Sequence, residues 1–270
     1  MKFPSIHSST IVRGPEPPAS LSLPAIFGEQ LSKLYQLVQR SRCVFASPVG
    51  PFYAQARDHY LPRFVYFGPD ASDASLRLSF LGGFDHRDLR PTLALLRLIV
   101  GLAMKPDLGQ ALNLSFFPLV DILGLARIAG HRQLAAENWT TAAAPEIGLL
   151  EKDARLRAYH GFVRLETGSS EDVVNVRLRA PAPVENAAPA LELISSEDVA
   201  PMPIRWESES TADVRDGPLS MADDLPLRPF ELTVRLPAAW PLDRYADAAA
   251  SILKRFVLRY RGFISYAQYL

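Results

Sequence analysis

The chain has 270 residues and no formal net charge, because 29 Lys and Arg side chains balance 29 Asp and Glu side chains. Hydrophobic residues make up 48% of it, which is typical of a globular protein and too apolar for a disordered one. The neutral balance argues against nucleic acid as a partner, since phosphate binding needs an excess of positive charge. A single cysteine, Cys43, excludes an internal disulfide framework and any metal site built from several thiolates.

The apolar segments of the chain bear on where it works. The longest of them, Leu93–Met104, is interrupted by Arg97 and is too short to span a bilayer. Residues 1–10 lack the apolar core of a secretory signal. We therefore expect a cytoplasmic protein that has no membrane partner.

The pattern of apolar residues predicts alternating helices and strands. Proline and serine in residues 1–25 indicate an irregular lead-in, and a single domain is expected over residues 26–270. The first predicted elements are a helix at Ile26–Arg42, strands at Arg63–Phe67 and Leu76–Leu81, a helix at Pro91–Met104 and a strand at Leu112–Phe117. A helix at Pro145–Arg157, strands at Gly161–Leu165 and Phe230–Leu236 and a final helix at Asp243–Arg259 follow.

Residues 181–229 differ from the rest of the chain. They are rich in proline and show no helical periodicity, but short β-type runs occur at Leu191–Ile194 and Ile204–Trp206. We interpret this stretch as an irregular β-rich insertion within the single domain.

Strands that alternate with helices predict an α/β fold, namely a three-layer αβα sandwich around a mixed, mostly parallel, twisted sheet. Leu76–Leu81 and Leu112–Phe117 are almost continuously apolar, as expected for strands that are covered on both faces. We expect these two strands, Gly161–Leu165 and Phe230–Leu236 to be neighbours at the centre of the sheet.

Acidic residues follow two of the predicted central strands. Asp85 and Asp88 come after the strand at Leu76–Leu81, and Glu166 comes after the strand at Gly161–Leu165. Ligands of open α/β sheets bind beyond the carboxyl ends of strands, so these carboxylates are candidates for a converging site. The alternative is that Asp88 caps the helix that starts near Pro91 and that Asp85 only solvates a turn.

The order and spacing of four segments resemble the zinc carboxypeptidase superfamily, in particular the branch of succinylglutamate desuccinylase and aspartoacylase-like proteins. Gly82 to Asp88 (GGFDHRD) resembles Gly-Gly-x-His-Gly-x-Glu, and Pro118 to Gly124 (PLVDILG) resembles Pro-x-x-Asn-Pro-x-Gly. Leu165 to Gly168 (LETG) resembles Leu-His-x-Gly, and Thr233 to Arg235 (TVR) resembles Thr-x-Glu. The resemblance implies a zinc-exopeptidase-like fold and a zinc-dependent hydrolase of peptides or N-acyl compounds.

Carried over position by position, the resemblance places the family's zinc ligands on Asp85, Asp88 and Glu166 and its general base on Arg235. The Arg that orients the electrophile falls near Arg127, and the Asn-Arg pair that binds the substrate carboxylate is missing from residues 134–139. Zinc prefers imidazole and thiolate ligands, whereas three carboxylates suit magnesium, manganese or calcium. A guanidinium stays protonated and cannot act as a general base.

The predicted strand at Phe230–Leu236 gives Arg235 a defined direction. Its apolar residues share one face, whereas Glu231, Thr233 and Arg235 share the other. We expect Arg235 to supply the positive charge that three converging carboxylates require. The alternative is that Arg235 faces solvent.

Three hypotheses follow for the function. The first is a catalytically inactive protein of this fold, a pseudoenzyme with a binding or regulatory role and no cofactor. The second is a hydrolase that uses a divalent metal in a rebuilt acidic site. The third is a structural or interaction protein with a closed pocket. The partner would be a small molecule, a peptide or another protein.

Overall fold

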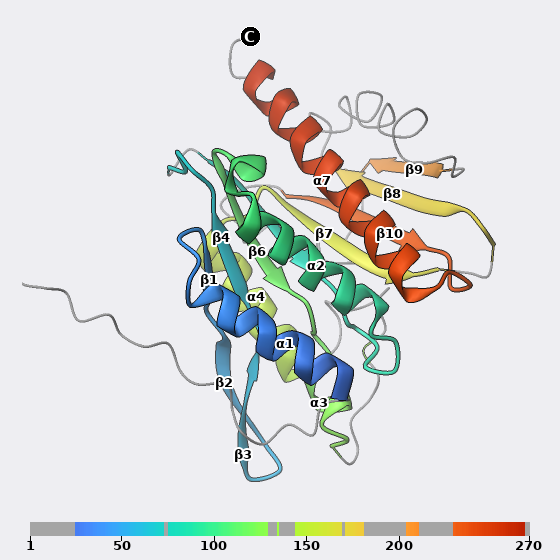
Figure 1. The fold of residues 1–270 in the computed structure, drawn as a ribbon. Coiled ribbons are helices and arrows are strands. Elements are labelled where there is room, and N and C mark those ends of the chain that lie inside the picture. The colour runs from blue at the N-terminus through green and yellow to red at the C-terminus, as the bar shows by residue number, and fades with distance from the viewer. Residues whose placement is uncertain are drawn as a thin grey trace, which may run out of the picture.

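The computed structural model describes residues 25–72, 75–128, 134, 144–168, 171–180, 204–210 and 229–267. Its centre is an eight-stranded mixed sheet with the strand order β1-β4-β6-β5-β7-β10-β8-β9. Helices α1, α2 and α7 cover one face of the sheet, and α4 lies on the other (Figure 1). The predicted three-layer α/β architecture is therefore confirmed.

The strands of the sheet are β1 (Val44–Ala46), β4 (Phe64–Phe67), β5 (Leu76–Leu81), β6 (Leu112–Phe117), β7 (Gly161–Thr167), β8 (Val174–Ala180), β9 (Ile204–Ser210) and β10 (Phe230–Leu236). A separate hairpin consists of β2 (Val49–Ala54) and β3 (Arg57–Leu61). The helices are α1 (Ala25–Val38), α2 (Arg90–Met104), the 3-10 helix η1 (Pro106–Gly109), α3 (Ile122–Leu125), α4 (Pro145–Arg157) and α7 (Leu242–Ala267).

Strands β6, β5, β7 and β10 are adjacent and parallel, as predicted. Strands β4 and β8 flank this set in the antiparallel direction. Because parallel strands end at the same edge of a sheet, the loops after β5, β6, β7 and β10 meet there. We call this edge the carboxyl edge.

The core explains why these strands form. Strands β5 and β6 are buried over nearly their whole length, and the rings of Phe80 and Phe116 stack with centroids 4.9 Å apart. On β10 the apolar residues Leu232 and Val234 are buried as well. Strands covered on both faces bury enough apolar surface to outweigh the entropy that the chain loses on folding.

Several elements were not predicted from the sequence, among them the hairpin β2–β3, strand β8 and helix α3. The hairpin β2–β3 contains Gly50 and Pro51, which read as a turn rather than a strand. Strand β8 alternates buried Val176 and Leu178 with Arg177 and Arg179, so it has no continuous apolar run. The single helical turn α3 is too short for periodicity to indicate it.

Most of the predicted insertion lies outside the described residues, including Leu191–Ile194, as do residues 1–24 of the predicted lead-in. Within the insertion, Ile204–Ser210 forms β9, which pairs in parallel with β8. The division into a lead-in and a single domain with an insertion stays a prediction.

His160 connects the start of β7 to β5. Its Nδ1 accepts a hydrogen bond from the Arg77 backbone N–H at 3.0 Å. Burial, together with the positive charge of Arg77, lowers the pKa of His160 below its ordinary value of 6.5. The folded protein therefore favours the neutral ring, which alone can accept this bond.

We expect stability to be pH-dependent through His160. The contribution of the neutral ring is fully present above pH 6.5, and it is lost as the pH falls through 6.5 towards the lower folded pKa. His160→Asn, which keeps an acceptor near the Nδ1 position, should make the free energy of unfolding less dependent on pH between pH 7 and pH 5. Urea denaturation across that range measures this free energy. If the variant loses as much stability as the wild type on acidification, groups other than His160 cause the loss.

Candidate functional site

The loop after β5 begins with a turn that only glycine can make. Gly83 has a φ of +64°, and a Cβ there would lie 2.7 Å from Thr92 Oγ1 and 2.8 Å from the Pro118 carbonyl oxygen. Its carbonyl accepts a hydrogen bond from the Asp121 N–H at 2.8 Å. The turn thus packs the loop after β5 directly against the loop after β6.

Asp85 forms an ion pair within its own loop. The Arg87 guanidinium donates to both carboxylate oxygens of Asp85, from Nε at 2.9 Å and from Nη2 at 2.8 Å. The hydrogen bond from Arg87 holds the pKa of Asp85 below its usual range, against the opposing effect of partial burial. Asp85 is therefore ionised and neutralised locally.

Asp88 is paired in the same way with Arg90, the first residue of α2. Arg90 Nε and Nη2 lie 2.8 Å and 2.9 Å from the two carboxylate oxygens. Burial raises the pKa of Asp88, but hydrogen bonds from Arg90 and the Thr167 hydroxyl outweigh it and lower the pKa. The Arg90 N–H also donates to Asp88 at 3.1 Å, so Asp88 satisfies a backbone group at the start of α2. The N-cap residue is Leu89, however, and not Asp88 as the alternative interpretation had it.

Glu166 lies between two arginines. The register of the parallel pair β7–β10 sets Glu166 beside Arg235, and Arg235 Nε donates to Glu166 Oε2 at 2.8 Å. Arg164 pairs with the other oxygen, Oε1. Arg235 therefore lies against one of the three carboxylates, whereas Asp85 and Asp88 are paired with Arg87 and Arg90.

Arg164 also belongs to a row of side chains with alternating charges that crosses strands β7, β10 and β8. Arg164 Nη1 lies 3.1 Å from Glu231 Oε1 on β10, and Arg179 Nη1 on β8 lies 3.9 Å from Glu231 Oε2. The side chains of Arg164 and Glu231 are only 4% and 2% exposed. We call Arg235, Glu166, Arg164, Glu231 and Arg179 the charge ladder.

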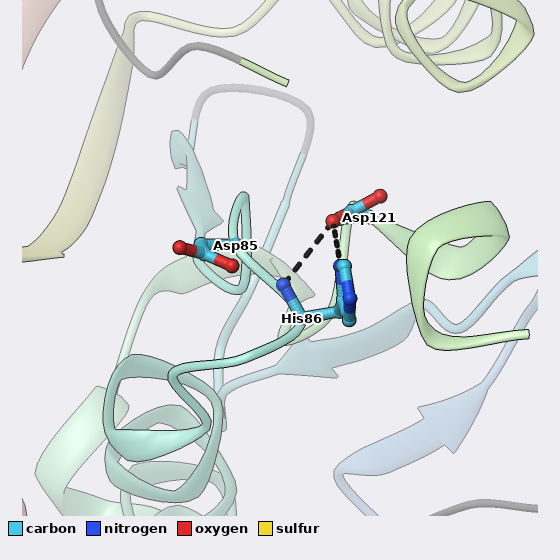
Figure 2. Close-up of side chains that lie close together, drawn as sticks. All are labelled: Asp85, His86 and Asp121. Carbon is cyan, nitrogen blue, oxygen red and sulfur yellow. Dashed lines mark hydrogen bonds and ion pairs between the residues drawn. The ribbon is translucent and has the colours of Figure 1, made fainter. Parts of the chain in front are cut away.

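Asp121, which the sequence analysis did not single out, joins the loops after β5 and β6. Its carboxylate is fully buried, and its Oδ2 accepts from the His86 ring Nδ1 at 2.7 Å and from the His86 backbone N–H at 3.1 Å (Figure 2). Its Oδ1 accepts from the Gly124 N–H at 3.0 Å, as in a helix N-cap. The signal in the sequence was an aspartate that directly precedes a short apolar turn.

Asp85, His86 and Asp121 bring one possible ligand atom each to within 4.8 Å of one another. In the described part of the chain this is the group of His and acidic residues that could hold a metal ion, and neither Asp88 nor Glu166 belongs to it. Figure 2 shows the two hydrogen bonds that join His86 to Asp121, with the Asp85 side chain beside them.

The donor sets can be tested against zinc, the metal that the family resemblance implies. At the positions that resemble its ligands, Asp85, Asp88 and Glu166 are each held by a guanidinium, which an ion would have to displace. The group that includes His86 offers one imidazole and two carboxylates, a set that divalent metals accept. Its possible ligand atoms, however, already form hydrogen bonds with each other, with backbone N–H groups or with Arg87. In this conformation neither group of residues fits a zinc ion.

The remaining candidates from the sequence are Arg127, Cys43 and residues 134–139. Arg127 follows α3 in a left-handed conformation, with a φ of +54°, and its side chain is exposed. Cys43 is half-buried against the core, in keeping with a packing role. Residues 135–139, where the substrate-binding pair of the family would fall, lie outside the described residues. No helix in the described ranges is both long and apolar enough to cross a membrane.

No protein-family model matches the sequence, and a comparison with curated proteins gives no match. Solved structures do match. A candidate metallopeptidase of Shewanella denitrificans is 17% identical, with a TM-score of 0.58 over 86% of this chain and 88% of that one. A metallo-carboxypeptidase of Burkholderia cenocepacia is 12% identical, with a TM-score of 0.63 over 87% of this chain and 69% of that one.

An aspartoacylase family protein of Mesorhizobium loti is 13% identical and covers 77% of this chain and 67% of its own, with a TM-score of 0.51. At these identities the similarity establishes the fold alone. The chain has the zinc carboxypeptidase-like fold, the fold of the metallo-carboxypeptidases and aspartoacylase-like proteins.

Proposed function

We propose that this protein is a catalytically inactive member of the carboxypeptidase-like fold that serves in binding or regulation. The observation that carries the proposal is the ion pair between Arg235 and Glu166 at 2.8 Å. By the family resemblance these two positions would carry the general base and a zinc ligand. A guanidinium bound to a carboxylate performs neither task, because it cannot accept a proton and it repels a cation.

The charges around the carboxyl edge support the same proposal. Asp85, Asp88 and Glu166 face Arg87, Arg90 and the two arginines of β7 and β10. A site for a divalent cation needs a surplus of negative charge or of neutral donors, and here each candidate carboxylate is already neutralised. Supplying a metal would therefore require at least one ion pair to open.

A second candidate function is a metal-dependent amide or N-acyl hydrolase. The grouping of Asp85, His86 and Asp121 favours it, because this set includes an imidazole. The similar structures include metallopeptidases, which points to a divalent metal such as zinc. On this alternative Asp85 and His86 would turn from their present partners to an ion, and Asp121 would hold the imidazole or bind the ion itself.

Metal content and activity separate the two functions. We expect the purified protein to contain no stoichiometric zinc, and to hydrolyse neither peptides nor N-acyl amino acids when zinc, cobalt or manganese is supplied. Elemental analysis and assays against a protein-free blank test this. One zinc per chain, lost in Asp85→Ala or His86→Ala but kept in the exposed hairpin variant Asp58→Asn, would favour the hydrolase.

A further inference from the structure

Side chains and backbone groups of the chain itself connect the loops of the carboxyl edge to one another. We propose that these contacts hold the loops together in place of a shared metal ion, so that the carboxyl edge keeps its conformation without metal. This inference rests on the proposed function, since an enzyme of this fold would use the metal both as a catalyst and as a connection between loops.

The first connection runs between the loop after β5 and the loop after β6. The buried Asp121 carboxylate accepts two hydrogen bonds from His86, one from the ring and one from the backbone. Gly124 makes this close approach possible, because a Cβ on it would lie 2.3 Å from His86 Nδ1 and 2.4 Å from Asp121 Oδ2. Asp121 is a positioning residue that holds the loop after β5 through these two hydrogen bonds.

The second connection joins the same loop to the end of β7, the two segments that hold the implied zinc ligands. The Thr167 hydroxyl lies close enough to Asp88 to lower the pKa of that carboxyl. Tyr245 of α7 donates to the Glu166 carbonyl oxygen at 2.8 Å, and its hydroxyl lies 3.5 Å from Thr167 Oγ1. An ion held by positions 85, 88 and 166 would link these elements, and here polar groups of the chain itself link them.

Two further contacts close the edge around β10. The Arg90 guanidinium donates to the Ala238 carbonyl oxygen, which ties the start of α2 to the loop after β10. The pair Arg235–Glu166 ties β10 to β7. All four loops of the carboxyl edge are thus connected through residues far apart in the sequence, and every connection is made by the chain's own polar groups.

Amide hydrogen exchange of the full-length protein, resolved by mass spectrometry or NMR, tests the proposal. Asp121→Asn removes the negative charge of the hydrogen-bond acceptor. Thr167→Val replaces the hydroxyl by a methyl group and keeps the shape of the side chain. Each variant should exchange about tenfold faster in residues 83–88, while amides of β5 and β6 keep the wild-type rate. Asp58→Asn, on the exposed hairpin, is the control and should leave residues 83–88 unchanged.

Chelation supplies the decisive comparison. We expect EDTA to leave the exchange of residues 83–88 in the wild type unchanged. Faster exchange with EDTA that added zinc reverses would overturn the inference, as would wild-type rates in both variants. Should Asp121→Asn fail to fold, Thr167→Val still decides the matter. Hydrolytic activity of the wild type that EDTA does not abolish, with exchange of residues 83–88 unchanged by EDTA, would contradict the proposed function while leaving this inference intact.

Discussion

Replacing Arg164 by methionine should lower the free energy of unfolding by about 3–5 kcal/mol, the usual effect of removing one partner from a buried ion pair. Arg164 lies inside the charge ladder, bound to Glu166 and 3.1 Å from Glu231, and its side chain is 4% exposed. Its guanidinium carbon also lies 5.8 Å from the centre of the Phe84 ring. Without Arg164 the Glu231 carboxylate, 2% exposed, would lose the guanidinium 3.1 Å away, while Arg179 lies 3.9 Å from its other oxygen.

Arg235→Met is the matched comparison. Arg235 is 30% exposed, and Glu166 would keep its bond to Arg164 after the change. We expect a loss of about 1 kcal/mol, because solvent screens a partly exposed pair. Urea denaturation of both variants measures the difference. Equal losses in the two variants, or a loss below about 1 kcal/mol for Arg164→Met, would show that burial does not govern the strength of the charge ladder.

The central part of the fold could be predicted from the sequence because its signal is local. Leu76–Leu81 and Leu112–Phe117 are apolar at nearly every position, and both are strands with those bounds. Strand β8 could not be predicted in this way. Arg177 and Arg179 alternate with its apolar residues, and their place on a polar face is set by pairing with the distant strand β10.

The candidate site was predictable only where the pattern of a strand determines it. Side chains alternate along a strand, so Arg235 could be assigned to the polar face of its strand, where it meets Glu166. The partners of Asp85 and Asp88 were missed for a different reason. Each is bound by the arginine two residues further on, and whether such a close neighbour turns back depends on the loop conformation.

Asp121 shows a further limit. Nothing in its immediate sequence indicates that the carboxylate is fully buried, since burial arises from the packing of two loops around Gly83 and Gly124. A lone aspartate in a loop is more often a turn or cap residue on the surface. The hydrogen bonds to His86 depend on contacts between segments that the sequence separates.

Installing the family's ligand set should create a zinc site on this backbone. The substitutions are Asp85→His, Asp88→Glu and Glu166→His, with Arg235→Glu at the position of the base. The register of β7 and β10 already sets residues 166 and 235 side by side, and the Thr167 hydroxyl lies close enough to Asp88 at the same edge to lower its pKa. Two imidazoles and a carboxylate are ligands that zinc prefers.

We expect the wild type to show no zinc-dependent change in melting temperature and the quadruple variant to bind one zinc per chain. Binding to the folded state alone would stabilise it by about 4 kcal/mol at a zinc concentration a thousand times the dissociation constant. Calorimetric titration and thermal unfolding with and without zinc measure both effects. The same variant with alanine at position 85 is the control, and it should bind much more weakly.

The quadruple variant and the wild type differ at these positions in the kind of ligand but not in formal charge. At the four positions, three carboxylates and one guanidinium become two carboxylates and two neutral imidazoles, so the formal charge does not change. Arg164 keeps its partner Glu231 in both proteins. If the quadruple variant folds but does not bind zinc, the loops of the carboxyl edge do not have an arrangement that can bind a metal ion. If it binds zinc, the backbone still supports a metal site, and the four substituted side chains alone account for the absence of zinc binding in the wild type.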